Sequence, residues 1–428
     1  MELQDIERNW DAIFNSLPNN WKELSLETKA LSVGSYVFND PYVLMKAMLC
    51  YLMAGVSFET VATRLMSQGI VKSVSSIGVL KKFRNCAVFF KELSTLMIQE
   101  RIQRELPNRT YPWVIRAFDG THIVTPGDKV KDLRLHMSID VLGGVMDYVE
   151  VTDIHGGESL KRFKTQEGEL ILADSGYGHR GGAASIMESG AHIIVRTNSR
   201  GMPLNNLDGS DFNFMNKFNN MKEHEMRSYQ IYFEDNGVIF NGRICAYKKD
   251  SDATQKSIKI AIKNAKRKGN KYPSESAIFA AGYVFIFTSL DEGEMATEDV
   301  LRFYRMRWQI EIYFKKLKSQ FDVGRPPSES PASLDAWIHG KILATLLVEG
   351  FADSAKPFPP QLNILNQHVS WELFREALSS MLTVVSLSLS PVDFCLNKHH
   401  MKALALFKEL HKKKGWIRDL NFWSEMMC

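Results

Sequence analysis

The chain has 428 residues, 45% hydrophobic and 24% charged, so it is long enough for two or three soluble domains with sizeable cores. A net charge of +4 is only mildly basic, so any contact with nucleic acid has to come from local patches. The five scattered cysteines form no C-x-x-C pair, which argues against a disulfide framework or zinc finger and indicates a reducing compartment. The longest apolar run, residues 43–56, is too short to span a bilayer, so a cytoplasmic protein without a membrane partner is expected.

Residues 1–105 are predicted to form an N-terminal helical domain. Within it, Ser57 and Ser75 each open a short helical pattern, and the second pattern carries Lys81, Lys82 and Arg84. Such a pair fits either a helix-turn-helix able to enter the major groove of DNA or a plain helical hairpin. The sequence leaves both interpretations open.

Residues 106–200 change to a strand pattern. The apolar runs 114–119 and 170–174 each end on an aspartate, Asp119 and Asp174, as expected of buried strands that deliver a carboxylate into a turn. Gly143-Gly144 predicts a hairpin that joins two strands at 133–141 and 145–152. The other expected elements are a strand at 192–196 and helices at 159–167 and 182–189. This order predicts an α/β fold with a mixed sheet.

Residues 201–290 interrupt this plan and are predicted to form a β-rich insertion. Strands are expected at 228–233, 238–247, 257–263 and 282–288. The basic run at 263–271 contains Lys266, Arg267 and Lys268. Such a run is either a solvated surface or a clamp for DNA phosphates.

Residues 291–328 are predicted to contain one continuous helix, Thr297 to Phe321, capped by Thr297. At about 100° per residue, its apolar side chains form one stripe, which indicates a core-facing helix. Beside that stripe lie Tyr304, Arg307, Glu311 and Lys318. Alone, this polar stripe is either a solvated flank or the border of a functional site. Residues 329–428 are predicted to form a C-terminal helical region, which begins with a helix at 334–351.

Asp119, Asp174 and Glu311 are the candidate catalytic residues. Three carboxylates that meet at the edge of a sheet repel one another unless cations neutralise them. An all-oxygen site of this kind suits Mg²⁺ or Mn²⁺, and two such ions about 3.5–4 Å apart promote phosphodiester chemistry. His122 and His179 lie nearby in the sequence and are expected to be local hydrogen-bonding residues.

The motifs resemble those of the DDE transposases of bacterial insertion sequences, in the group named for a Tyr-Arg-Glu-Lys signature. Tyr304, Arg307, Glu311 and Lys318 reproduce the spacing of that signature without a gap. Phe-Asp119-Gly-Thr is similar to the first acidic motif, and Ala-Asp174-Ser-Gly-Tyr is similar to the second. Many relatives have an arginine where this chain has Ser175, which leaves the acidic ligand in place.

The resemblance implies an RNase H-like catalytic core, residues 106–200 and 291–328, with the insertion between its parts. It implies an enzyme that cleaves transposon ends and joins the freed 3′-hydroxyls to target DNA, with Asp119, Asp174 and Glu311 holding two Mg²⁺ or Mn²⁺ ions. Tyr304, Arg307 and Lys318 would then contact the DNA end. Trp308 either stacks on an unpaired base or packs against the insertion. The expected partners are double-stranded DNA, at the nucleoid, and a second copy of the chain in a homodimer formed through the C-terminal helices.

Three alternatives have different activities. A nuclease of the same fold would cut DNA without joining it, and a domesticated, inactive transposase would only bind DNA. A transcription regulator with a sensor domain would leave the three acids unexplained. Intact Asp119, Asp174 and Glu311 favour an enzyme, because clustered acids do not help a protein to bind anionic DNA.

Overall fold

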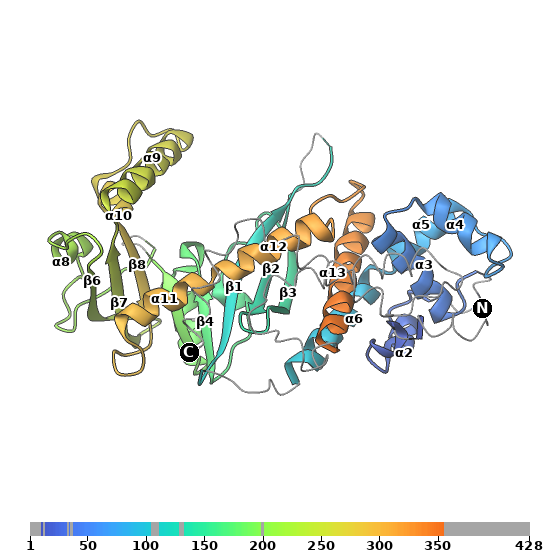
Figure 1. The fold of residues 1–428 in the computed structure, drawn as a ribbon, viewed down its shortest axis with the longest axis horizontal. Coiled ribbons are helices and arrows are strands. Elements are labelled where there is room, and N and C mark those ends of the chain that lie inside the picture. Colours follow the sequence, from blue (N-terminus) through green and yellow to red (C-terminus); the bar gives the residue numbers. More distant parts are fainter. Residues whose placement is uncertain are drawn as a thin grey trace, which may run out of the picture. The chain divides into compact units, whose positions relative to one another are not determined.

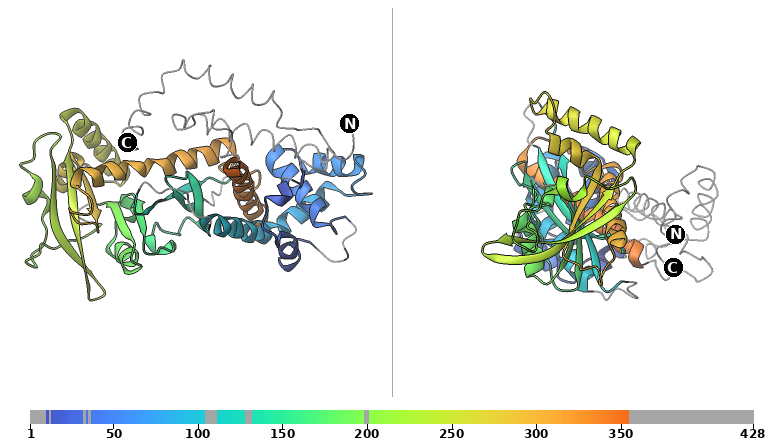
Figure 2. Two further views of the ribbon diagram at one scale, coloured as in Figure 1. Left: turned by 60° about the horizontal axis from the view of Figure 1, so that its bottom comes forward. Right: turned by 90° about the vertical axis from the view of Figure 1, so that its left-hand side faces the viewer.

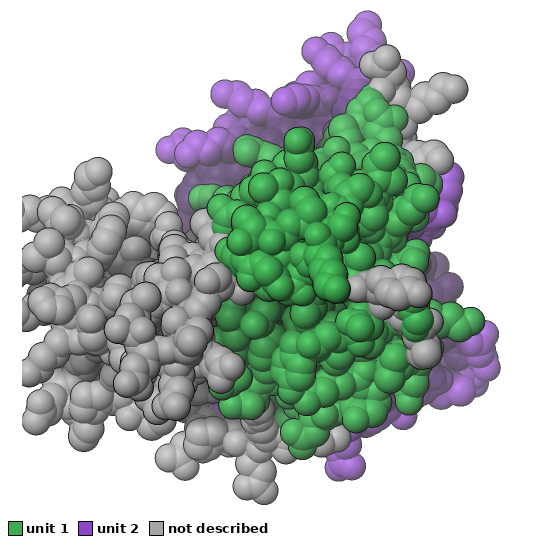
Figure 3. Space-filling model, turned by 90° about the vertical axis from the view of Figure 1, so that its right-hand side faces the viewer, with its two compact units in different colours: residues 1–105, 123–132, 315–428 green, residues 106–122, 133–314 purple. Residues whose placement is uncertain are grey.

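The computed structural model divides the chain into two compact units (Figure 3). Unit 1 contains residues 1–105, 123–132 and 315–428, and unit 2 contains residues 106–122 and 133–314. The residues that the structure describes are 10–11, 13–31, 34, 37–103, 111–127, 132–197 and 201–354. Each unit is described by itself below.

Unit 2 is built on an eight-stranded sheet (Figures 1 and 2). The strand order is β3-β2-β1-β4-β5-β8-β7-β6. The strands are β1 (Val114–Ile123), β2 (Leu133–Asp140), β3 (Val145–Asp153), β4 (Glu169–Ala173), β5 (His192–Arg196), β6 (Met226–Asp235), β7 (Val238–Lys248) and β8 (Tyr283–Thr288). β1, β4 and β5 run parallel, and β2 and β3 form the predicted antiparallel hairpin, so the sheet is mixed. With its flanking helices, this is an RNase H-like fold.

The expected helix at 159–167 is wrong, because only the 3₁₀ turn η1 (Leu160–Arg162) forms there. A second 3₁₀ turn, η2 (Ser175–Tyr177), follows β4. The helix α7 (Arg180–Glu188) then connects β4 to β5 and packs on β5 and β6. The strand β5 has the predicted bounds.

The region 201–290 extends the central sheet. β8 pairs with β5, β7 with β8 and β6 with β7, all antiparallel. The helices here are α8 (Phe214–Phe218), α9 (Ser251–Arg267) and α10 (Glu275–Ala281). The strand expected at 257–263 is therefore wrong, since these residues lie within α9. α9 packs on α10 and α10 packs on β8, and Figure 1 shows the two helices standing off the sheet at β8.

The core of unit 2 lies on both faces of the sheet. Every residue of β4 is buried, as expected for a parallel strand that is covered on both sides. One cluster of buried side chains joins Phe118, Ile171 and Ala173 of the sheet to Ala183 and Ile186 of α7. The helix α11 (Thr297–Met306) packs on β4 to β8. The sheet is thus held between helices, and its strand ends are fixed in position.

The described residues of unit 1 form helices and their connections. The helices of its N-terminal part are α2 (Trp21–Glu27), α3 (Pro41–Ala54), α4 (Phe58–Ser67), α5 (Ser76–Asn85) and α6 (Ala87–Gln103). The predicted helix at 334–351 is confirmed as α13 (Pro331–Ser354), which packs on α3, α5 and α6. The rest of the predicted C-terminal region, residues 355–428, lies outside the described residues. None of the helices in the described ranges is long and apolar enough to cross a membrane.

The predicted pair of helices at residues 57–85 is present as α4 and α5, with Ser57 and Ser75 as their caps. Two of the three basic side chains on α5 make contacts inside unit 1. Lys82 is buried and donates to the carbonyl oxygen of Ala30 at 3.0 Å, and Arg84 donates to Ser333 Oγ at 2.8 Å. These contacts favour a packed helical hairpin over a recognition helix that presents all three charges to DNA.

Candidate active site

Asp119 and Asp174 lie next to each other at the same edge of the sheet. β1 pairs in parallel with β4, and Phe118 of β1 is the register partner of Ala173 of β4. Each aspartate is the next residue along its chain. Asp174 follows the end of β4 as predicted, whereas β1 continues beyond Asp119 to Ile123, because Asp119 and Gly120 keep an extended backbone. The register brings the two carboxylates together as the sequence predicts.

The segment that carries the signature is not one continuous helix. It consists of α11 and α12 (Trp308–Gln320), with Arg307 between them. The amides of Arg307 and Ile310 donate to carbonyl oxygens three residues back, at 3.2 and 3.1 Å, which tightens the turn at this point. The predicted cap is also wrong, because Ala296 occupies the N-cap position and Thr297 Oγ1 donates to Glu292 at 2.8 Å.

Tyr304 and Arg307 join the three acids into one site. The Tyr304 hydroxyl donates to Asp174 Oδ1 at 3.0 Å. Arg307 Nη2 donates to Glu311 Oε1 at 2.5 Å, and Arg307 Nη1 lies 3.6 Å from Asp119 Oδ2. Each acid of the predicted triad is therefore in contact with a residue of the signature.

The site is partly buried, and burial shifts the pKa values of its side chains. Burial raises the pKa of Asp119 to about 6, while the Gly120 amide and Arg307 act to lower it and Asp174 acts to raise it. Burial also raises the pKa of Tyr304, and the neighbouring Asp174 adds to this effect. Burial acts to lower the pKa of Arg307, yet the groups around it, Tyr304 and Glu311 among them, raise it overall. The guanidinium therefore stays charged and compensates the acids.

The donor set fits a hard divalent cation. Carboxylate oxygens in a partly buried site are the ligands that Mg²⁺ and Mn²⁺ prefer. As the side chains stand, no three His, Cys, Asp or Glu residues in the described ranges are grouped closely enough to hold an ion. Arg307 and Tyr304 contact these carboxylates in the structure.

The other residues predicted to bind DNA have different environments. Trp308 is 59% exposed on α12. Lys266, Arg267 and Lys268 are exposed at the end of α9. Lys318 lies near the end of α12, in the part of the chain assigned to unit 1, where Gly324 packs against its aliphatic stem. Tyr304, Arg307 and Glu311 are thus the signature residues that the structure places at the aspartates.

The two nearby histidines are not candidate ligands. His122 Nε2 lies 3.2 Å from Arg134 Nη2, in the local hydrogen-bonding role expected of it. His179 is the N-cap residue of α7, and its exposed side chain makes no capping hydrogen bond.

Several polar residues beside the aspartates carry no sequence signal. Tyr177 in η2 and His136 in β2 are buried next to Gly120, and Arg134 of β2 pairs with Glu158. They come from separate elements and follow no periodic pattern. Only the Gly-Tyr of the second acidic motif could have drawn attention to Tyr177.

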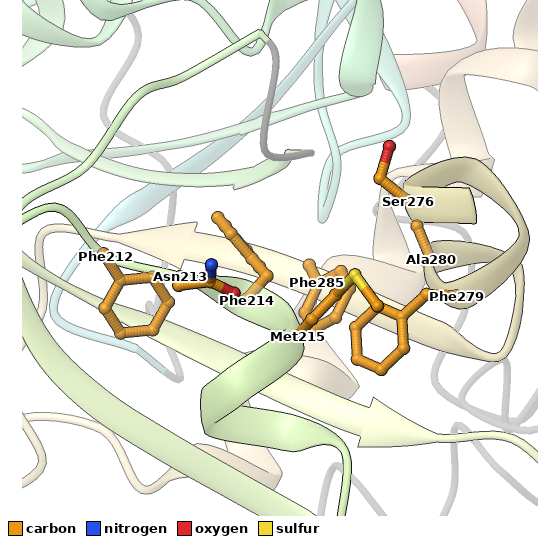
Figure 4. A pocket seen from close by; sticks show the side chains of 8 residues that line it. All are labelled: Phe212, Asn213, Phe214, Met215, Ser276, Phe279, Ala280 and Phe285. Atoms are coloured by element: carbon orange, nitrogen blue, oxygen red, sulfur yellow. The ribbon is translucent and has the colours of Figure 1, made fainter. Parts of the chain in front are cut away.

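A separate apolar pocket of about 200 Å³ lies among α8, α10 and β8 (Figure 4). Its lining residues are Phe212, Asn213, Phe214, Met215, Ser276, Phe279, Ala280 and Phe285. None of them is an acid, and none belongs to the site described above. This pocket therefore has no part in the chemistry of the carboxylates.

A mixed RNase H-like sheet that brings two aspartates together with a glutamate from a later helix defines the class of DDE transposases. The chain belongs to this class: the family model described as "Transposase DDE domain" matches residues 112–347, more than half of the chain.

Curated relatives agree with this assignment. The chain is 29% identical over 363 residues to the transposase for insertion sequence element IS421 of Escherichia coli, covering 82% of this chain and 96% of that protein. The putative transposase InsL for IS186A of Escherichia coli K12 is similar to the same extent. The transposase for IS231F of Bacillus thuringiensis subsp. israelensis is 24% identical over 313 residues, which covers 64% of this chain and 65% of that protein. These relatives are transposases or putative transposases of insertion sequences.

Proposed function

We propose that the protein cleaves phosphodiester bonds at the ends of an insertion sequence and joins the freed 3′-hydroxyls to target DNA. The observation that carries this proposal is the set of contacts that links Asp119, Asp174 and Glu311 through Tyr304 and Arg307. The family assignment supports a reaction on DNA, and the acids supply the chemical means for it.

Asp119, Asp174 and Glu311 would hold the divalent cations, Mg²⁺ or Mn²⁺. Two such ions, when bound, polarise the phosphodiester and activate its nucleophile. The register of β1 and β4 and the first turn of α12 support this role, because they would set the positions of the oxygen ligands. Partial burial of Asp119 keeps bulk water from screening the charges at this point.

Tyr304 and Arg307 would bind the phosphates of the DNA end. A guanidinium donates two parallel hydrogen bonds to a phosphate as readily as to a carboxylate, so Arg307 can exchange an acid for the substrate. Lys318 adds a positive charge, and exposed Trp308 has a free face on which an unpaired base can stack. Lys266, Arg267 and Lys268 would contact phosphates farther along the duplex.

The partners of this reaction are the terminal repeats of the element, the target DNA and a second copy of the chain. Two ends have to be brought together for joining, so a homodimer is the simplest functional assembly. It would act in the bacterial cytoplasm, bound to the nucleoid.

The decisive experiment measures nicking of a duplex that carries the element's own end, with Mg²⁺, with Mn²⁺ and with EDTA. We expect metal-dependent nicking by the wild type, and its loss in Glu311→Ala and Asp119→Ala with end binding retained. Glu298→Ala is the matched control, because Glu298 is an exposed acid of α11 that pairs with Arg302.

The same substrates separate the alternatives. Nicking without joining of pre-cut ends would identify a nuclease of the same fold. Tight end binding without cleavage in either metal would identify a protein that only binds DNA. Loss of binding together with cleavage in Asp119→Ala would assign that residue a structural role and contradict the proposed one.

A further inference from the structure

Glu158 lies against the turn that carries Asp174. It follows β3, in the connection to η1, and its carboxylate rests on the Cα of Gly176, so that a Cβ at Gly176 would overlap Glu158 Oε2. Gly176 is two residues beyond Asp174. Because Gly176 has no side chain, it leaves space for the carboxylate of Glu158. Glu158 therefore reaches the end of β4, next to Asp174, as a fourth carboxylate.

Arg134 orients this carboxylate. Arg134 Nη1 lies 3.8 Å from Glu158 Oε1 and donates to the carbonyl oxygen of Gly156 at 3.3 Å, while Nη2 lies 3.2 Å from His122 Nε2. A guanidinium with contacts on several sides has a fixed plane, and this restricts the position of Glu158. The side chain of Glu158 keeps 33% of its surface exposed, so water has access to its oxygens.

Two buried polar atoms next to Asp119 point to a bound ligand. A Cβ on Gly120 would lie 3.2 Å from Tyr177 Oη and 3.4 Å from His136 Nδ1. Tyr177 and His136 are at most 1% exposed, and neither atom has a hydrogen-bond partner among the described residues. Buried polar groups are almost always paired with protein or with ordered water.

The tautomer of His136 identifies the kind of ligand. We assign the ring hydrogen of His136 to Nε2, which lies 3.1 Å from Thr152 Oγ1, because that hydroxyl can donate its single proton to the carbonyl oxygen of Asp153 at 3.0 Å. Burial, followed by the charge of Arg162, lowers the pKa of His136 to about 4, so the ring is neutral and Nδ1 is an acceptor. An acceptor beside the hydroxyl of Tyr177 is a site for water rather than for an anion.

We propose that Glu158 is a fourth carboxylate of the active site, which orients the attacking water and accepts its proton in the hydrolytic nicking step. Tyr177 and His136 hold ordered water beside it. The inference rests on the proposed function.

In the nicking step the water oxygen forms the new bond to phosphorus and the bond between phosphorus and the 3′ oxygen breaks. The water's proton passes to the carboxylate of Glu158, and the departing 3′ oxygen takes up a proton from solvent. Joining uses a 3′-hydroxyl that the bound DNA itself positions. Glu158 is therefore needed for hydrolysis and not for joining.

The test compares nicking of intact ends with joining of pre-cut ends for Glu158→Gln. We expect nicking to fall by roughly a hundredfold, the lower range for loss of a general base. Joining and the affinity for Mn²⁺, measured by electron paramagnetic resonance, stay at the wild-type level. Glu150→Gln is the matched control, because Glu150 is similarly exposed and pairs with Arg162.

Gly176→Ala is the second variant, because its new Cβ displaces the carboxylate of Glu158 while the glutamate itself remains. It should show the same selective loss of nicking, whereas Gly157→Ala, where an added Cβ meets nothing within 4 Å, should not. Equal losses in nicking and joining, weaker Mn²⁺ binding, or unchanged nicking in Glu158→Gln would each overturn the inference. A wild type that neither nicks nor joins would instead overturn the proposed function.

Discussion

Arg307 contacts two of the three acids proposed to be catalytic, at the point where a cation would compensate their charge. The side chain of Arg307 is 11% exposed and its guanidinium contacts Asp119 and Glu311, while Tyr304 contacts the remaining acid, Asp174. The signature residues that would bind a DNA end therefore also contact the acids. Binding of phosphate by Arg307 would release the carboxylates, so DNA and metal affinity should be coupled.

We predict that Arg307→Met weakens binding of the DNA end and strengthens binding of Mn²⁺ in the absence of DNA. The variant loses the phosphate contact, and it also loses the cation that competes with the metal. A change on the order of tenfold in each affinity lies within the usual range for coupled sites. Calorimetric titration with Mn²⁺, and gel-shift titration with the DNA end, would measure the two effects.

Arg305→Met is the control for this prediction, because Arg305 is exposed and lies only two residues away. It should leave the affinity for Mn²⁺ unchanged. If Arg307→Met bound Mn²⁺ more weakly than the wild type, the guanidinium would be supporting the metal ligands rather than competing with the metal.

The sequence predicts the residues of the site that have a local signature. Asp119 and Asp174 each end an apolar run, and the polar stripe on the later helix supplies Glu311. Glu158, Tyr177 and His136 could not be predicted in this way, because they meet only through the fold. Glu158 lies in a connection without periodicity, and the role of Gly176 becomes visible only when the carboxylate is seen against its Cα.

At the scale of elements, the segment that forms α9 has a sequence pattern that fits both a strand and a helix, which is why the sequence predicts a strand there. Ile258, Ile260 and Ile262 alternate as in a strand. The spacing of Ile258, Ile262 and Ala265 also fits one face of a helix, and Ile260 is left 60% exposed. Asp250 decides between the two, because its side chain caps the helix by accepting from the Ala253 amide at 2.7 Å.

The break at Arg307 has no signal in the sequence. Sharp breaks in helices usually coincide with proline or glycine, and neither occurs between Thr297 and Phe321. The hydrophobic stripe continues through the break, since Met306 and Ile310 are both buried. Periodicity alone therefore predicts one long helix where the structure has α11 and α12.

In unit 1, a buried lysine connects α13 to α3. Lys341 is 5% exposed, donates to the carbonyl oxygen of Leu52 at 2.5 Å and lies 4.5 Å from the centre of the Trp337 ring. Burial lowers its pKa from 10.5 to about 8, against the opposing charge of Asp322. The unfolded chain therefore holds one more proton than the folded chain between about pH 8 and 10.5.

We predict that the stability of the wild type, relative to Lys341→Met, rises as the pH increases through this window. Stability rises with pH wherever the unfolded state binds more protons, at up to about 1.4 kcal/mol per pH unit for one group. Across the whole window the free energy of unfolding of the wild type, relative to Lys341→Met, should rise by about 3 kcal/mol. Below about pH 8 Lys341 is charged in the folded state as well, so the wild type is destabilised by the full cost of burying that charge. Urea unfolding of both proteins from pH 7 to 10.5 would measure the difference. A difference that stays constant with pH would show that Lys341 keeps its ordinary pKa when folded.

At the scale of the whole molecule, charge is distributed unevenly over a chain whose total is nearly balanced. The 53 lysines and arginines face 49 acids, so the molecule as a whole attracts DNA only weakly. α9 and the residues after it concentrate basic side chains on a helix that packs on α10 and stands off the sheet (Figure 1). Extension of the catalytic sheet through β8, β7 and β6 places this basic helix in the same unit as the acids.

We predict that replacing Lys266, Arg267 and Lys268 together by alanine weakens binding of every duplex to a similar degree and reduces its dependence on salt. Phosphate contacts carry no sequence information, and each one lost lowers the slope of log K against log salt by about 0.9. Titrations at several salt concentrations, with the element's end and with an unrelated duplex, would measure both effects. Lys256 and Lys259, exposed near the middle of α9, provide a double variant for comparison. A loss confined to the element's own end would show that these residues read sequence rather than phosphate. An unchanged slope would show that the basic run is only a solvated surface, and DNA would then be held by the signature residues at the acids.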